Sequence, residues 1–68
     1  MTGSEFNNLM TGNGFTQATL AARWGVARQT IGKQCNSDLV DPLYADAIKA
    51  ITFEKQAEKL QEVIDLFK

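Results

Sequence analysis

The residues best suited to chemistry lie in one stretch of twenty, residues 17–36, with the sequence QATLAARWGVARQTIGKQCN. This stretch contains three basic residues, Arg23, Arg28 and Lys33, and no acidic residue. Cationic and hydrogen-bonding side chains suit the phosphates and base edges of nucleic acid. The composition of the stretch therefore favours DNA as a partner.

The charge of the whole chain is divided unevenly along the sequence. The formal net charge is −1, whereas DNA-binding domains are usually basic. Residues 1–37 contain one acidic and three basic residues, while residues 38–68 contain seven acidic residues and four lysines. A near-neutral total thus conceals a basic half and an acidic half.

The sequence offers little for catalysis or for a bound group. It has no histidine and a single cysteine, Cys35, so an intramolecular disulfide is impossible and a zinc site lacks ligands. We find neither a paired carboxylate in a plausible pocket nor a glycine loop for phosphate, and we expect no enzyme activity, no cofactor and no metal. Cys35 is expected to be a small buried hydrophobe. Without a membrane-spanning run or a signal peptide, we expect a cytoplasmic protein.

Helix signals follow one another along the chain. Residues 1–11 are expected to form a helix with a Thr2–Glu5 capping box and an apolar face of Phe6, Leu9 and Met10. Thr16 is expected to cap a second helix from residue 17 to about 24, which Gly25 ends. A third helix is expected from residue 27 to about 34.

Asp41 and Pro42 form a strong start signal for a fourth helix. Cys35 or Leu39 is expected to fill the core beside the polar Gln34. No β pattern occurs, so the sequence predicts a small all-α domain of four to five helices. The apolar residues expected to be buried in the second to fourth helices are Leu20, Ala21, Trp24, Ile31, Leu43, Tyr44, Ala47, Ile48 and Ile51.

Residues 52–68 are expected to form an amphipathic helix distinct from a domain of residues 1–51. Their apolar residues continue a 3, 4, 3, 4, 3 spacing that begins at Ala50 and is typical of a helix–helix seam. Two arrangements are open: the helix folds back on its own domain, or it pairs with a second copy, which we favour. The predicted dimer seam consists of Phe53, Ala57, Leu60, Ile64 and Phe67.

Residues 15–31, FTQATLAARWGVARQTI, resemble the helix-turn-helix proteins of the lambda-repressor and Cro family, and residues 4–51 do so more loosely. The shared positions are Gln17 at the start of the second helix, Ala21 within it, Gly25 at the turn and Ile31 in the third helix. Ala21 also has a physical reason, because a small side chain lets two helix backbones approach closely.

The resemblance implies that the third helix lies in the DNA major groove. Arg28 and Gln29 would then contact guanine and adenine, Thr30 a thymine methyl or a phosphate, and Lys33 a base or the backbone. Further contacts to the DNA backbone would come from Gln17, Arg23 and Asn36.

The sequence therefore predicts a sequence-specific, homodimeric DNA-binding transcriptional regulator, most similar to a phage or bacterial Cro-like repressor that occupies an operator. Such dimers usually contact half-sites about one helical turn, ~34 Å, apart. The alternative is a protein-interaction module, an antitoxin-like or antirepressor-like partner, that uses the helical seam and keeps the helix-turn-helix as a scaffold.

Overall fold

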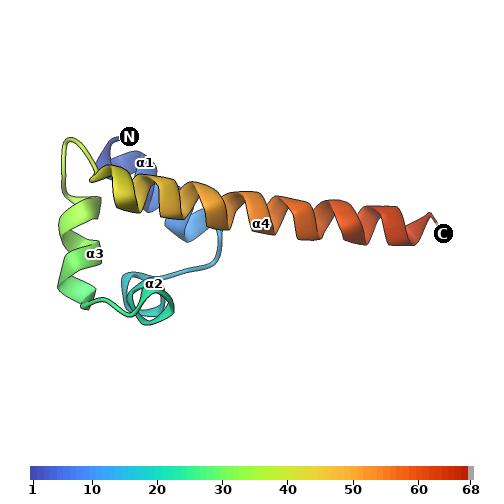
Figure 1. Cartoon of the computed structure of the whole chain (residues 1–68), viewed down its shortest axis with the longest axis horizontal. Helices are drawn as coiled ribbons and strands as arrows, with labels where there is room; N and C mark the ends of the chain where they lie inside the picture. The colour runs from blue at the N-terminus through green and yellow to red at the C-terminus, as the bar shows by residue number, and fades with distance from the viewer. Residues whose placement is uncertain (68) are drawn as a thin grey trace.

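The computed structural model describes residues 1–67, which form four helices and no strand. The helices are α1 (Gly3–Gly12), α2 (Gln17–Trp24), α3 (Arg28–Cys35) and α4 (Pro42–Leu66). The first three gather around the beginning of α4, and the rest of α4 projects away from them (Figure 1). The C-terminal end of α4 and helix α3 thus lie at opposite ends of a molecule 44 Å long.

Helix α1 begins two residues later than expected, because Thr2 is its N-cap and not part of the helix. The Thr2 hydroxyl accepts a hydrogen bond from Glu5 N, and the Glu5 carboxylate accepts one from Thr2 N, which confirms the capping box. The helix ends at Gly12, and Gly14 then adopts a positive φ of 83° that lets the chain turn toward α2.

The limits of α2 agree with the prediction, and those of α3 are displaced by one residue. Thr16 caps α2 as expected. Ala27 is the N-cap of α3 and offers no side-chain hydrogen bond to it, so the helical residues begin at Arg28 and not at Ala27.

The core lies between α1, α2, α3 and the first three turns of α4. Trp24, expected in the core, is half-buried at its edge, where its ring centroid lies 6.2 Å from that of Phe6 and 5.9 Å from that of Tyr44. Favourable aromatic pairs have such separations. The buried hydrophobic residues are Phe6, Met10, Leu20, Ala21, Ile31, Val40, Ala45, Ile48 and Ile51.

The core beside Gln34 is closed differently from the prediction. Leu39 is 76% exposed and Cys35 is only half-buried, while Val40 is almost completely buried. Gln34 is itself buried, because its Oε1 accepts a hydrogen bond from Asp41 N at 3.0 Å. That bond satisfies the amide oxygen, so a polar residue can occupy the position.

Helix α4 is one uninterrupted helix of 25 residues, not a fourth and a fifth helix. The predicted boundary at residues 51 and 52 therefore lies inside it. Leu43 is 70% exposed, so its predicted place on the inner face is wrong; Ala45 lies there with Ile48 and Ile51. No helix of residues 1–67 combines the length and the apolar character needed to cross a membrane.

The apolar side of α4 changes along its length. Ala45, Ile48 and Ile51 face the core, whereas Ala50 and the five predicted seam residues lie on a side turned by about 150°, at 100° per residue. The second apolar side thus points away from the body formed by α1–α3, and the described part of the chain does not fold back over it.

Candidate nucleic-acid interface

The turn between α2 and α3 is fixed by Gly25. Its φ of 67° and ψ of 33° are left-handed, a conformation that costs other residues ~1 kcal/mol or more. This geometry lets Val26 N donate to Ala21 O at 3.0 Å and Gly25 N donate to Ala22 O at 3.4 Å, so the end of α2 is closed by its own backbone. The turn sets the direction in which α3 leaves α2.

The packing of α2 on α3 determines which side of α3 faces outward. Ala21 and Ile31 are buried, and α3 contacts both α1 and α2. Gln29, Lys33 and Asn36 recur every four and three residues, which places them on one outer stripe of α3. All three are exposed, as is Arg28 at the first position of the helix, while Thr30 is half-buried.

Gln17 lies against α3 and links the two helices. A Cβ atom placed on Gly32 would lie 3.2 Å from Gln17 Oε1, closer than almost all real contacts of this kind. The Gln17 side chain also lies near the Cys35 thiol. Burial raises the pKa of the Cys35 thiol, so this group stays protonated at neutral pH. The glycine within α3 is therefore matched to the side chain of Gln17.

Two residues predicted to contact the DNA backbone have partners within the chain. Arg23 Nη2 lies 3.8 Å from Glu54 Oε2, so the guanidinium is directed toward α4 and lies apart from the stripe on α3. Both side chains are exposed, and such a pair contributes little to stability. Asn36 is the C-cap of α3, and its Nδ2 donates to Gly32 O at 3.0 Å.

Two contacts that hold the C-terminal end of α3 have no obvious signal in the sequence. Gly3 is buried, its N donates to Ser37 O at 2.8 Å, and a Cβ atom there would overlap the carbonyl oxygens of Cys35 and Ser37. The second contact is the Gln34–Asp41 hydrogen bond. The first fixes the C-terminal end of α3 to the start of the chain, and the second fixes it to the loop seven residues further on. The one sign of them in the sequence is a polar residue among positions expected to be buried.

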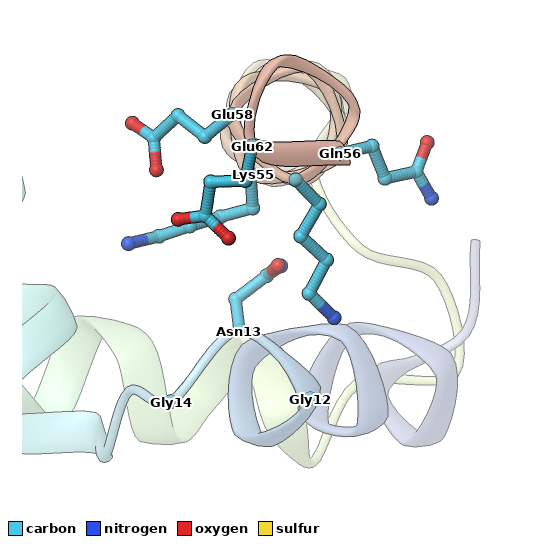
Figure 2. A pocket seen from close by; sticks show the side chains of 8 residues that line it. Gly12, Asn13, Gly14, Lys55, Gln56, Glu58 and Glu62 are labelled. Atoms are coloured by element: carbon cyan, nitrogen blue, oxygen red, sulfur yellow. The ribbon is translucent and has the colours of Figure 1, made fainter. Parts of the chain in front are cut away.

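An open cleft lies elsewhere, between α4 and the turn after α1 (Figure 2). It has a volume of about 540 Å³, and two lysines and two glutamates line its α4 side. Asn13 points into it from the turn, but its Nδ2 already donates to Leu9 O and Thr52 Oγ1. The charges that line the cleft are balanced, and the Asn13 amide already has its partners, so we interpret the cleft as a gap where α4 leaves the body. None of the predicted site residues lies in it.

The five residues of the predicted dimer seam are all exposed. Phe53 is 73% and Phe67 is 87% exposed, although both are large apolar side chains, and the same is true to a lesser degree of Leu60 and Ile64. The seam lies on the part of α4 that projects beyond the body. Contiguous apolar surface of this kind marks a place of protein interaction.

Comparisons with known proteins give no match of significance, whether to family models, to curated proteins or to solved structures.

Proposed function

We propose that this chain is a sequence-specific, double-stranded-DNA-binding regulator of transcription that works as a homodimer. The observation that supports it most is the arrangement of α2 and α3: two short helices cross at a left-handed Gly25, and α3 presents Arg28, Gln29 and Lys33 to solvent. This is the arrangement in which helix-turn-helix proteins place one helix in the major groove.

The chemistry of the outer face of α3 supports direct reading of bases. Arg28 matches the two acceptors of guanine, and Gln29 matches the donor and acceptor of adenine. Lys33 lies one turn beyond Gln29 on the same stripe, within reach of a base or a phosphate. The N-terminal end of α2 at Gln17 favours a phosphate through its helix dipole. We assign no DNA contact to Arg23 while Glu54 holds it.

The small number of cations predicts how such binding responds to salt. Without Arg23, residues 17–36 offer two basic side chains per protomer, Arg28 and Lys33, so log K should fall with log [salt] with a slope of about −2 per protomer. Non-specific affinity is then low, and base contacts and dimerisation must supply most of the affinity. Occupation of a promoter operator, as in a Cro-like repressor, is the simplest regulatory mode.

Selection of bound sites from random duplex DNA tests this proposal. We expect a defined site, and we expect Arg28→Ala with Gln29→Ala to weaken binding to it at least hundredfold, since each bidentate contact is worth about 1–3 kcal/mol. The control is Lys55→Ala with Gln56→Ala, which removes one cationic side chain and one glutamine from α4. Enrichment of no site, or equal binding by the α3 variant, refutes the proposal.

A second candidate is a protein-interaction module, favoured by the exposed seam of α4. In that case α2 and α3 serve as a scaffold. The variant with Arg28→Ala and Gln29→Ala then keeps its binding to the partner protein, whereas substitutions in the seam abolish that binding. The α3 substitutions therefore separate the two candidates.

A further inference from the structure

The sizes of the side chains along the exposed seam of α4 indicate how two copies would pair. The seam has two small and four large apolar side chains at positions where a coiled coil buries them: Ala50, Phe53, Ala57, Leu60, Ile64 and Phe67. The offset of about 150° from the core-facing residues turns this side away from the body. The part of α4 that carries it projects beyond α1, α2 and α3, so a second helix can approach it (Figure 1). Asp46, exposed on the same side one turn before Ala50, limits the seam at its beginning.

We propose that residues 50–67 of α4 pair antiparallel with the same residues of a second copy. In the register we infer, Ala57 faces Leu60, Ala50 faces Phe67, and Phe53 faces Ile64 across the two-fold axis. Every layer that contains an alanine then also contains a large side chain. Facing positions of this kind interdigitate and fill space evenly.

A parallel pair fills the same seam poorly. Identical residues then face each other, so the layers of Ala50 and Ala57 are too small and the layers of Phe53 and Phe67 too large. Each methylene left without contact weakens association about fourfold. A parallel pair does gain one exposed ion pair on each side, Lys49 with Glu54 of the second copy, but such a pair changes affinity by no more than about fivefold. Packing thus outweighs this gain.

Charge does not decide the direction of the pair. Lys55, Glu58, Lys59 and Glu62 line the cleft beside the turn after α1, so they lie on the side of α4 opposite the seam. Among the residues beside the seam, the antiparallel pair places Glu54 next to the amide of Gln61 of the second copy. The packing of the seam therefore sets the direction.

The arrangement has a consequence for DNA that rests on the proposed function. At 1.5 Å per residue, the starts of the two α4 helices lie about 50 Å apart along the coil. That exceeds one helical turn of DNA, ~34 Å. Two copies joined in this way are expected to contact half-sites separated by more than one turn.

The existence of the pair is tested on the full chain by sedimentation equilibrium. We expect a dimer, and we expect Leu60→Asp to raise its dissociation constant about a hundredfold or more, because both Leu60–Ala57 layers lose an apolar side chain. The matched control, Leu66→Asp, changes another exposed leucine of α4 that lies off the seam. Circular dichroism checks that both variants keep their helices. A monomeric wild type, or equal effects of the two substitutions, overturns the proposal.

The direction of the pair is tested by spin labels on Asp46→Cys in a Cys35→Ser background. Asp46 lies about twelve residues from the two-fold axis, so the antiparallel pair places the two backbones about 37 Å apart at this position. A parallel pair places them about 10 Å apart, and that result overturns the proposal. No DNA is present in either measurement. A wrong pairing therefore leaves the DNA proposal standing, and failure to bind DNA leaves the pairing standing.

Discussion

The two halves of α4 contain apolar residues at similar spacing but use them in opposite ways. In the first half, Ile48 is completely buried against the body. In the second half, Phe53 and Leu60 are exposed on the other side of the helix. A regular apolar pattern thus shows that a helix has a partner, but it does not show whether that partner belongs to the same chain.

The largest expected difference between the halves is in stability. Ile48→Ala leaves a cavity in the core and should lower the free energy of unfolding by about 2–5 kcal/mol. Leu60→Ala should change it by less than about 0.5 kcal/mol when the protein is dilute enough to be monomeric. Urea unfolding followed by circular dichroism measures both. Similar losses for the two variants would mean that the second half of α4 packs within its own chain.

Two glycines at the ends of α1 compare a packed position of the body with an open one. Gly3→Ala should destabilise the body by about 2 kcal/mol, because the new methyl group meets backbone carbonyls of Cys35 and Ser37 that have little freedom to move. Gly12→Ala is the control, since its Cβ meets nothing within 4 Å and α1 gains a better helix former. Thermal unfolding should show a lower midpoint for the first variant and an equal or higher one for the second.

A pair of lysines compares the two regions in DNA binding. Lys33→Ala on α3 should weaken binding to the selected site about tenfold and reduce the magnitude of the salt slope by about one unit. Lys55→Ala on the projecting half should alter neither quantity. Fluorescence anisotropy titrations at several salt concentrations provide both numbers. A salt slope that responds to Lys55 and not to Lys33 would move the interface to α4.

The smallest effect concerns the start of α1. Hydrogen bonds from the Thr2 backbone and hydroxyl hold the pKa of Glu5 below its usual value. A carboxyl with a lowered pKa in the folded state stabilises the protein above its unfolded pKa, and this contribution disappears as the pH falls through the folded value. Glu5→Gln should therefore flatten the loss of thermal stability on acidification. An unchanged pH profile would show that the charge of Glu5 adds nothing to stability.

The sequence predicts the local elements of this fold well, because each depends on residues close together. Thr2, Thr16, Gly25 and Asp41 occupy the caps and turns that their chemistry favours, and the structure confirms all four. Ala27 has no capping side chain, so the sequence does not signal the start of α3. The helix begins at Arg28, one residue later than predicted.

The errors concern long-range packing. The sequence predicts Cys35 or Leu39 in the core beside Gln34, but Val40 is buried instead. Val40 N donates to Met1 O at 2.9 Å, a contact with the start of the chain that spacing does not reveal. Leu43 was placed inside because it is apolar, although Ala45 faces the body. The role of Gln17 against Gly32 likewise depends on the crossing of two helices. The exposed stripe of α3 was foreseen in position, while its contacts with DNA remain a prediction.

Helix α4 continues from Pro42 to Leu66 without an internal glycine or proline. Because the helix has no kink site, it fixes the distance and the rotation between the body and the seam. The number of residues between Ile51 and Phe53 sets the rotational phase of the seam relative to the body. One residue inserted there turns every later position by 100° and advances it by 1.5 Å, whereas seven residues restore the phase to within about 20° and add about 10 Å. The number of residues in α4 thus sets both the distance and the rotation between the bodies of a dimer. Insertions in this helix would therefore change the spacing of the DNA half-sites that the two bodies contact.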